Sequence, residues 1–416
     1  MKFAKELSEK ITTKRALVGT IGVGYVGSAV ARGAAEAGFT VIGFARSNRS
    51  IEGVNALHIK NLTATRDFSR LTSCDVLSLC VPTPVHRSNR PNMRFMSQAL
   101  TTVASHLRPG QLITIESSVA PGTTRHVALP ILETSGLVGG EDFFLSFSPE
   151  RIDPGNTSYD ITNIPKVISG LNELSLVLAK QFYSSFVATV VPVSTLETAE
   201  LTKVFENVFR FVNIGLATEV SRFAQKAGIN MWEVIEAAST KPFGFLPHYP
   251  GPGIGGDCIP VLPYYLLAGA KTVGVDLPIV RAAARVNMRR PRQVVERTLE
   301  LINGKFKKNN GKPRVLLVGI AYKPESSDLR QSAALKIWEL LVELGVNVSY
   351  HDPYVPKWNG AVSQELHPEF LKEQDAIVIV THHKNIPFDV LVEARTPVLD
   401  TRNVFGQHRH SHIVRL

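Results

Sequence analysis

The residue best suited to nucleophilic chemistry in this sequence is Cys258, in the segment Gly251-Pro-Gly-Ile-Gly-Gly-Asp-Cys258-Ile-Pro260. Glycine carries no side chain, so this loop would let a substrate come close to the sulfur. A thiol with a lowered pKa is a strong nucleophile. The alternative is a buried structural cysteine, which fits poorly among so many glycines and prolines. Cys74 and Cys80 lie in or beside an apolar run and are instead expected to be core residues.

Three polar residues elsewhere could assist such a thiol. Glu150 follows an apolar run in the segment Ser-Phe-Ser-Pro-Glu150-Arg. Lys203 and Asn207 are four positions apart on a predicted helix and therefore lie on the same side of it. The alternative for this pair is a solvated helix face on which Lys203 pairs with Glu200 or Glu206. The residues alone favour the solvated helix face.

The segment Gly22-Val-Gly24-Tyr-Val-Gly27 has the spacing of a dinucleotide-binding turn. It follows a predicted strand over 15–22 and opens a predicted helix over 25–37, which is the context that this motif needs. Gly22 would permit the tight turn, Gly24 would let a pyrophosphate approach the backbone, and Gly27 would let helix and sheet pack closely. The helix N-terminus would face the phosphates with its unpaired N–H groups. A glycine turn without a ligand is the alternative.

The acidic residue that usually follows the second strand of such a domain, where it binds the ribose 2′-hydroxyl, is missing. Its position falls near Ala45, in the segment Phe-Ala45-Arg46-Ser47-Asn-Arg49. Arg46, Ser47 and Arg49 are groups that could hold a 2′-phosphate, so this segment favours NADP or a relaxed choice of cofactor. The alternative is that both arginines are solvated loop charges.

The elements that carry these residues predict an α/β fold. Apolar strands expected over 39–45, 75–81, 111–116 and 143–147 alternate with helical stretches, which indicates a parallel, doubly wound sheet. Helices are expected next over 195–226, 231–239 and 264–303, followed by a Lys-Asn-Gly-Pro linker over 305–313. Strands over 314–319, 346–350, 375–381 and 397–400, with a helix over 331–345, predict a second α/β domain.

The predicted architecture is therefore two Rossmann-like, doubly wound domains joined by a long central helix and a helical middle domain. The predicted boundaries are 1–194 for an N-terminal NAD(P)-binding domain, 195–304 for the central helical domain and 305–416 for the C-terminal domain.

Composition and charge narrow the classes of partner. The 416 residues are 44% hydrophobic, which is ordinary for a globular chain with a large core. The sequence contains no run of about 18 uncharged apolar residues, the length that would predict a membrane span. Residues 1–14 lack the apolar centre of a signal peptide, and three cysteines make no disulfide framework, so a cytoplasmic protein is expected. The net charge of +10 is compatible with a protein that binds nucleic acid. The Lys and Arg residues are scattered, however, and a site for an acidic small molecule explains the charge as well.

Eight motifs in a fixed order make the chain resemble the UDP-glucose/GDP-mannose dehydrogenase family of nucleotide-sugar 6-dehydrogenases, from about residue 15 to residue 405. They are Gly22 to Gly27; Val81-Pro82-Thr83-Pro84; Glu116-Ser-Ser118-Val-Ala-Pro-Gly-Thr-Thr124; Ser148-Pro-Glu150-Arg151; Lys203 to Asn207 with Arg210 and Asn213; the Cys258 loop; Gly319-Ile-Ala-Tyr-Lys323 with Asp328 and Arg330; and Asp400-Thr-Arg402-Asn403. Together they are highly specific for this family.

The resemblance implies that the C6 alcohol of a UDP-sugar is oxidised to a carboxylate by two hydride transfers. Cys258 would add to the intermediate aldehyde to give a thiohemiacetal, and the thioester formed next would be hydrolysed. Glu150 would position or activate water, while Lys203 and Asn207 would stabilise negative charge on oxygen. Ser118 takes the place of the family's threonine hydroxyl.

The resemblance also implies the binding residues, and no metal ligand is among them. For the cofactor, NAD by family default, they are Gly22, Gly24, Tyr25, Val26, Gly27, Arg46, Ser47, Arg49, Pro82, Thr83 and Ser118. For the UDP-sugar they are Glu150, Arg151, Lys203, Asn207, Arg210, Gly253, Gly255, Lys323, Arg330 and Arg402. The cations in the second set match an acidic diphosphate, so nucleic acid is not expected as a partner.

The wording of two motifs, Ser-Pro-Glu-Arg and Gly-Pro-Gly-x-Gly-Gly-x-Cys-Ile-Pro, resembles the branch that acts on UDP-N-acetylglucosamine or UDP-N-acetylmannosamine. Three positions depart from the family: Ala45 replaces the acid, Ser118 replaces threonine, and Leu262 stands where an Asp follows the thiol by four residues. Asp257, just before the thiol, could serve in place of that Asp. A dehydrogenase with an altered product or regiochemistry and a nucleotide-sugar-binding protein without turnover are therefore alternatives.

The helix expected over 195–227 is apolar on more than one face, whereas an isolated helix needs one buried stripe. The apolar residues are Leu201, Val204, Val208, Phe211, Val212 and Leu216. Because the family uses this helix as a dimer core, the resemblance implies a homodimer. The alternative is that the helix is buried within one chain.

Overall fold

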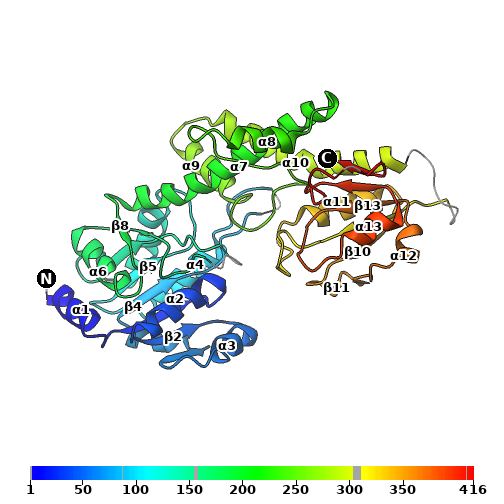
Figure 1. The fold of residues 1–416 in the computed structure, drawn as a ribbon. Coiled ribbons are helices and arrows are strands. Elements are labelled where there is room, and N and C mark those ends of the chain that lie inside the picture. The colour runs from blue at the N-terminus through cyan, green and yellow to red at the C-terminus, as the bar shows by residue number, and fades with distance from the viewer. Residues whose placement is uncertain (1, 87, 154–157, 303–310, 409) are drawn as a thin grey trace. The chain divides into compact units, whose positions relative to one another are not determined.

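The computed structural model describes residues 2–86, 88–153, 158–302, 311–408 and 410–416. It divides into two compact units, Met1–Glu206 with Tyr264–Val275, and Asn207–Pro263 with Asp276–Leu416. Figure 1 shows the elements of both units in chain order. Because these units are defined by packing, the predicted division of the chain into three domains stays a prediction. Most of the predicted linker over 305–313 lies outside the described residues.

The first unit is built on an eight-stranded sheet in the order β3-β2-β1-β4-β5-β6-β7-β8. The strands are β1 Leu17–Ile21, β2 Thr40–Phe44, β3 Leu62–Thr65, β4 Val76–Leu79, β5 Leu112–Ile115, β6 Phe144–Phe147, β7 Lys166–Gly170 and β8 Val190–Pro192. All neighbours are parallel except β6 and β7, which run antiparallel. The order of the first six strands is that of a dinucleotide-binding fold, and the predicted doubly wound sheet is confirmed.

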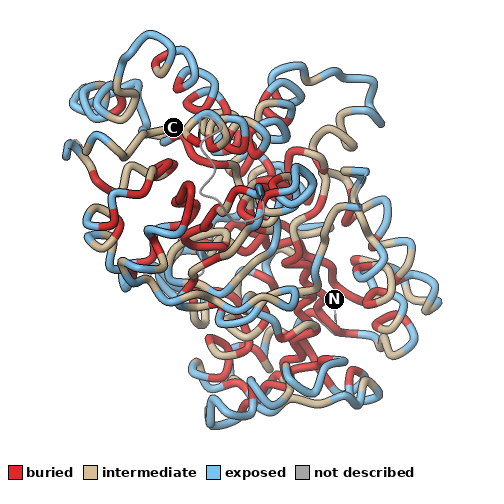
Figure 2. Tube along the Cα trace, turned by 90° about the vertical axis from the view of Figure 1, so that its right-hand side faces the viewer, coloured by how far each residue is buried: buried red, intermediate tan, exposed pale blue. Residues whose placement is uncertain are grey.

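Helices cover both faces of this sheet, and two separate apolar clusters fill the spaces beneath them. The α-helices are α1 Lys2–Thr12, α2 Tyr25–Glu36, α3 Asn48–Asn55, α4 Arg94–Ala104, α5 Leu129–Glu133, α6 Glu173–Tyr183 and α9 Leu262–Thr272, with a 3₁₀ helix Phe68–Ser73 and a π turn Thr124–Ala128. Strands β4, β5 and β6 are buried at every residue, as expected for a sheet covered on two sides. Figure 2 shows the buried residues along the trace in red.

The helical middle of the chain consists of α7 Leu196–Lys226, α8 Met231–Ser239, α9 and α10 Pro278–Ile302. Helix α7 is a single helix of 31 residues, as predicted, and the hydroxyl of Thr195 caps its first turn through the N–H of Thr198 at 3.0 Å. The predicted helical stretch over 264–303 is two helices. Gly274 has a positive φ of 73° that ends α9, and Pro278 starts α10, since proline suits a first helical position.

The second unit contains a five-stranded parallel sheet in the order β10-β9-β13-β14-β15. Its strands are β9 Arg314–Val318, β10 Asn347–His351, β13 Ala376–Ile379, β14 Val398–Asp400 and β15 Ile413–Arg415, and a short hairpin pairs β11 Lys357–Trp358 with β12 Ala361–Val362. Helices α11 Ala333–Glu343, α12 Pro368–Lys372 and α13 Asp389–Ala394 accompany it. Apolar clusters on both faces confirm the second Rossmann-like domain. Within the described ranges, none of the helices combines the length and the apolar character needed to cross a bilayer.

Candidate active site

The glycine turn joins β1 to α2, and each of its glycines meets a different surrounding. Gly22 has a φ of +88°, and a Cβ there would lie 2.6 Å from the carbonyl oxygen of Cys80. A Cβ on Gly27 would lie 2.2 Å from the carbonyl oxygen of Gly22, so only glycine lets α2 pack this closely. A Cβ on Gly24 would meet none of the more distant residues that the structure describes within 4 Å. The turn therefore leaves open space at the N-terminus of α2, and these residues fit a bound pyrophosphate.

The residues expected to contact the ribose follow β2, which lies beside β1. The N–H of Gly22 donates to the carbonyl oxygen of Phe44 at 2.9 Å, so the glycine turn and the end of β2 are adjacent. Ala45 is buried, Arg46 is exposed and reaches Gln98 at 3.3 Å, and Ser47 stands at the N-cap position of α3. No carboxylate stands at this strand end in the sequence.

The loops after β4 and β5 are bound to one another next to this turn. The N–H of Val81 donates to the Ser117 hydroxyl at 2.9 Å, and the Thr83 hydroxyl donates to the carbonyl oxygen of Ser118 at 2.7 Å. Pro82, Thr83 and Ser118 thus lie at the carboxyl ends of strands that neighbour β1. Open α/β sheets bind their dinucleotides at this edge, so the structure brings the predicted cofactor residues together.

Glu150 lies three residues beyond β6 and is 7% exposed. Its Oε1 accepts the backbone N–H groups of Arg151 at 2.7 Å and Ile152 at 2.8 Å, and its Oε2 accepts Lys166 Nζ at 2.9 Å. Burial raises the pKa of this carboxyl, but Lys166 and the two N–H groups outweigh burial and lower it below its usual value. Lys166 had not been singled out in the sequence. The signal that could have identified Lys166 in the sequence is that this lysine begins an apolar run.

The predicted substrate contacts differ in pairing and burial; they are Arg151, Lys203, Asn207 and Arg210. The guanidinium of Arg151 pairs with Glu206 of α7 at 2.5 Å, so its charge is balanced within the first unit. On α7, Asn207 is buried at 5% exposure, Lys203 is half-buried and Arg210 is exposed. The burial of Asn207 is inconsistent with a wholly solvated helix face.

Glu200, considered in the sequence as a partner for Lys203, binds the segment that follows Ser118. It is buried on α7 and accepts the backbone N–H groups of Gly122 at 2.5 Å and Thr124 at 2.7 Å. Burial raises the pKa of Glu200 to about 7 against the opposing effect of these donors. The carboxylate therefore fixes the loop of the predicted Ser118 hydroxyl to the first turns of α7.

The thiol loop belongs to the second unit, where its glycines lie against other segments. A Cβ on Gly253 would lie 2.9 Å from Cβ of Ala333, and one on Gly256 would lie 2.9 Å from the ring of Tyr322. Asn287 of α10 accepts the N–H of Ile254 at 2.8 Å. These contacts hold the loop by its backbone and leave Cys258 exposed.

The carboxylate of Asp257, considered in the sequence as a substitute for the missing Asp, is paired within the second unit. It forms an ion pair with Arg330, which also binds Asp328 at 2.5 Å. Burial raises the pKa of Asp257, and Arg330 opposes that effect. Leu262 is buried at the start of α9, and its N–H donates to the carbonyl oxygen of Cys258 at 3.0 Å.

The remaining predicted cations lie on loops that follow β9 and β14 of the second unit. Lys323 Nζ lies 5.9 Å from the centre of the Tyr322 ring. Arg402 donates through Nε to the carbonyl oxygen of Val380 at 2.7 Å, and a Cβ on Gly251 would lie 2.9 Å from its Nη1. Burial lowers the pKa of Arg402 to about 10, and the Asp400 charge opposes this. Arg402 therefore faces the first glycine of the thiol loop.

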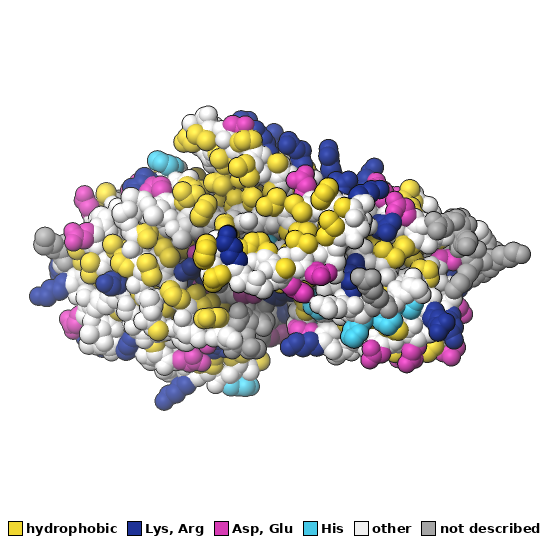
Figure 3. All heavy atoms as spheres, turned by 45° about the horizontal axis from the view of Figure 1, so that its top comes forward, with side chains coloured by type: hydrophobic (Ala, Val, Ile, Leu, Met, Phe, Trp, Pro, Cys, Tyr) yellow, Lys and Arg dark blue, Asp and Glu magenta, His cyan; other side chains and the backbone are white. Residues whose placement is uncertain are grey.

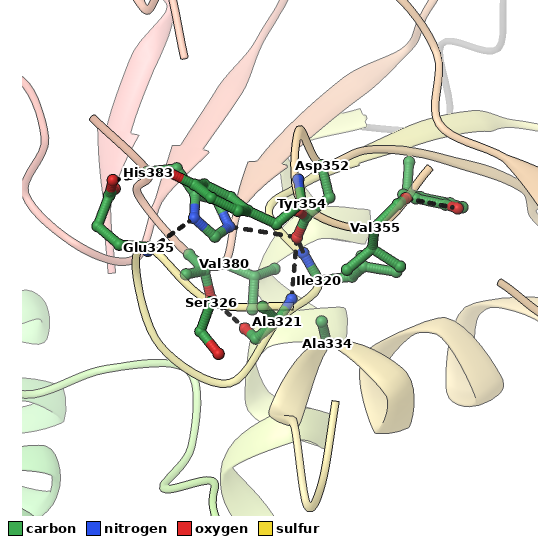
Figure 4. A network of polar contacts seen from close by, with 12 residues as sticks. Ile320, Ala321, Glu325, Ser326, Ala334, Asp352, Tyr354, Val355, Val380 and His383 are labelled. Atoms are coloured by element: carbon green, nitrogen blue, oxygen red, sulfur yellow. Dashed lines mark hydrogen bonds and ion pairs between the residues drawn. The ribbon is translucent and has the colours of Figure 1, made fainter. Parts of the chain in front are cut away.

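A buried network shapes the turn that precedes Lys323, as Figure 4 shows. Asp352 accepts the N–H groups of Ile320 at 2.7 Å and Ala321 at 3.0 Å, and it lies 3.2 Å from His383 Nε2. The N–H of Glu325 donates to His383 Nδ1 at 3.0 Å, so the ring proton sits on Nε2 and points to Asp352. Burial raises the pKa of Asp352, and its donors more than offset this and lower it. No local sequence signal marked this pair.

Three domains of one family match the chain in order. They are the NAD binding domain at residues 54–187, the central domain at 197–289 and the UDP binding domain at 316–407, each of the UDP-glucose/GDP-mannose dehydrogenase family. A UDP-N-acetyl-D-mannosamine dehydrogenase of Pyrococcus horikoshii is 32% identical over 94% of this chain and 96% of its own length.

The chain belongs to the UDP-glucose/GDP-mannose dehydrogenase family. It is thus an NAD(P)-dependent oxidoreductase that acts on a CH–OH group, as expected from its motifs. The NAD binding domain of D-isomer specific 2-hydroxyacid dehydrogenases also matches residues 3–98, which include the glycine turn. Cys258 and Lys203 lie in the matched central domain, and Arg402 lies in the matched UDP binding domain.

Further relatives are also named as dehydrogenases of N-acetylated sugars. A UDP-N-acetyl-D-glucosamine 6-dehydrogenase of Pseudomonas aeruginosa is 34% identical over 81% of this chain and 83% of its own. The solved structure of the UDP-D-ManNAc dehydrogenase of P. horikoshii superposes with a TM-score of 0.85 at 30% identity, covering 96% of this chain and 98% of that chain. A solved NDP-N-acetyl-D-galactosaminuronic acid dehydrogenase of Methanosarcina mazei gives a TM-score of 0.79 at 28% identity, covering 98% of this chain and 97% of that one.

Proposed function

We propose that this chain oxidises the C6 alcohol of a UDP-N-acetylhexosamine to the uronic acid through a covalent intermediate on Cys258. The observation that carries the proposal is an exposed thiol on a glycine loop, in a chain of this dehydrogenase family. The names of the Pyrococcus and Pseudomonas relatives support N-acetylmannosamine or N-acetylglucosamine as the sugar.

Each predicted residue has a defined task in this reaction. NAD(P), when bound, supplies the acceptor for the two hydrides that leave C6. The Cys258 thiolate forms an S–C bond to the aldehyde carbon, and the charge that develops on oxygen is stabilised by Lys203 and Asn207. Glu150 removes a proton from water as it adds to the thioester, and the C–S bond then breaks to return the thiolate. One alcohol and one water yield one carboxylate, with four electrons removed as two hydrides and three protons released.

The stoichiometry of reduced cofactor tests this proposal. The purified chain, assayed with UDP-N-acetylglucosamine, UDP-N-acetylmannosamine, UDP-glucose and UDP-galactose, is expected to form two reduced cofactors per sugar acid. One reduced cofactor per turnover, with aldehyde or another product seen by mass spectrometry, would favour the altered dehydrogenase that Leu262 motivates. No reduced cofactor with any sugar, despite binding, would favour a protein without turnover.

We also propose that the ribose end of the cofactor site accepts NADP. The proposal rests on Ala45 in place of an acid and on Arg46 and Arg49 after β2. A ribose 2′-hydroxyl favours a carboxylate partner, whereas a 2′-phosphate favours guanidinium groups.

Replacing Arg46 by alanine is expected to lower kcat/KM for NADP by about tenfold or more, because one charge-assisted phosphate contact is lost. The value for NAD should change little. Arg15→Ala is the matched control, because Arg15 precedes β1 at the opposite end of the strand and pairs with Glu9. Equal losses for both cofactors, or none, would contradict the proposed 2′-phosphate contact.

A homodimer through α7 is proposed from a stripe of exposed apolar side chains along this helix. They recur at spacings of three, four and seven residues and so share one face; they are Leu201, Phe205, Phe209, Leu216, Val220 and Phe223. The buried face of the same helix carries Val204, Val208 and Phe211. Figure 3 shows hydrophobic side chains (yellow) gathered over the helical middle of the chain. A second copy of the same helix would cover the stripe, since a two-fold axis pairs one patch with itself.

Charge on this stripe is expected to dissociate the dimer. The double substitution Leu216→Glu and Phe223→Glu places two carboxylates in a face that the second copy would bury, so light scattering should report the mass of a single chain. Val342→Glu, at an exposed apolar residue of α11, is the control and should leave the mass unchanged. A wild-type chain that is monomeric at assay concentration would refute the dimer.

A further inference from the structure

Three charged side chains touch one another in the interior of the first unit. Lys166 Nζ donates to Glu116 Oε2 at 2.8 Å and to Glu150 Oε2 at 2.9 Å. The side chains of Lys166, Glu116 and Glu150 are 3%, 0% and 7% exposed. Buried ion pairs are seldom better for stability than apolar residues of the same size, so this cluster calls for another explanation.

The sheet explains why these residues meet. Glu116 directly follows β5, and Glu150 follows β6 by three residues. Strand β7 runs antiparallel to β6, so its first residue, Lys166, lies at the edge where β5 and β6 end. The same edge carries the predicted cofactor and water-activating residues. The Lys166 side chain therefore reaches Glu150 from β7, a strand that carries no other predicted site residue.

The two carboxylates differ in their second oxygen. Glu150 Oε1 accepts two backbone N–H groups, whereas Glu116 Oε1 accepts the hydroxyl of Tyr183 at 2.9 Å. Burial raises the pKa of Glu116, and Lys166 opposes that rise. Glu116 and Glu150 therefore share Lys166 as the cation that lies between them.

We propose that Lys166 is a positioning residue that holds the Glu150 carboxylate in its ionised form and in one orientation for attack by water. This inference rests on the proposed function, because it assigns the origin of the base used to hydrolyse the thioester. With Oε1 on two N–H groups and Oε2 on Lys166, the carboxylate cannot turn without breaking a hydrogen bond.

The other titratable groups described around the cluster do not supply the positive charge that keeps Glu150 ionised. Cys80, which follows β4, and Tyr183 of α6 both have a pKa raised well above the usual value by burial, so both stay neutral near neutral pH. Arg151 offers Glu150 its backbone N–H, and its guanidinium is paired with Glu206. Thr114 continues the hydrogen bonds from Tyr183 at 2.8 Å and does not titrate.

The test compares two substitutions in the same buried cluster. Lys166→Met removes the positive charge at similar length, and Glu116→Gln removes a carboxylate charge while keeping the shape of the side chain. In Lys166→Met, the acidic limb of the pH profile for acid formation is expected to move up by about one to three pH units, because an opposite charge next to Glu150 is lost. In Glu116→Gln the limb should not move up, because this substitution removes a negative charge beside Glu150 and keeps Lys166.

Three further measurements separate this role from a structural one. The rapid phase of cofactor reduction should be unchanged in Lys166→Met, because hydrolysis alone uses Glu150, and Lys166→Arg should restore the wild-type pH profile. If Lys166→Met folds poorly, the double variant with Glu116→Gln removes the excess buried charge and carries the same test. An unshifted acidic limb in folded Lys166→Met would overturn the inference. A wild-type chain that fails to form two reduced cofactors would overturn the proposed function instead.

Discussion

Replacing Cys258 by alanine is expected to abolish formation of the sugar acid, with a loss of about 10⁴-fold or more in its rate. Without the sulfur, the aldehyde cannot form the thiohemiacetal. The second hydride transfer, which converts the thiohemiacetal to the thioester, therefore cannot occur. The first oxidation does not need the thiol. The variant should therefore form one reduced cofactor per sugar and release aldehyde, which absorbance and product mass spectrometry can measure together.

Cys80→Ala is the matched control for this experiment. Its thiol lies beside the glycine turn, and burial raises its pKa well above the usual value, so it is not a nucleophile near neutral pH. Acid formation in this variant should stay at the wild-type level. If Cys258→Ala still yields two reduced cofactors and acid, the covalent route is wrong and hydration of a free aldehyde replaces it.

Replacing Glu150 by glutamine is expected to slow steady-state acid formation by about 10²- to 10⁴-fold, the usual worth of a general base. Both hydride transfers precede the step that uses this carboxylate. A rapid-mixing experiment should thus show a burst of two reduced cofactors per chain followed by slow turnover. Intact-protein mass spectrometry during that slow phase should show the sugar attached to Cys258.

Glu206→Gln provides the comparison, because it changes a nearby carboxylate that pairs with Arg151 and has no part in hydrolysis. This variant should keep fast turnover without a burst. A Glu150→Gln protein that turns over slowly and shows no burst would assign the carboxylate to a hydride step. Normal turnover would remove it from the mechanism altogether.

The glycine turn shows which features a sequence predicts well. Glycines at 22, 24 and 27 were expected to serve the turn, the ligand and the packing, and their φ angle and close approaches fit those tasks. All of this follows from neighbours within one strand, turn and helix, where spacing alone sets geometry. The long helix α7 was predictable for the same reason.

The cluster of Glu116, Glu150 and Lys166 marks the opposite case. These residues are brought together by the pairing of β5, β6 and β7, and the antiparallel direction of β7 has no signal in a local pattern. Arg330 was expected to meet a diphosphate, yet it already binds two carboxylates from different loops. Its role with substrate stays a prediction, because side-chain pairing across a fold cannot be read from spacing.

Because the three cysteines differ in exposure, the protein is suited to site-selective chemical labelling. Burial raises the pKa of Cys74 to about 12 and that of Cys80 well above the usual value, whereas Cys258 is exposed. A mild alkylating reagent should therefore modify a single position, without any engineered handle. The rate of that modification, followed as nucleotide sugars are added one at a time, would rank ligands by how well they shield the sulfur, even for sugars that the protein binds without oxidising.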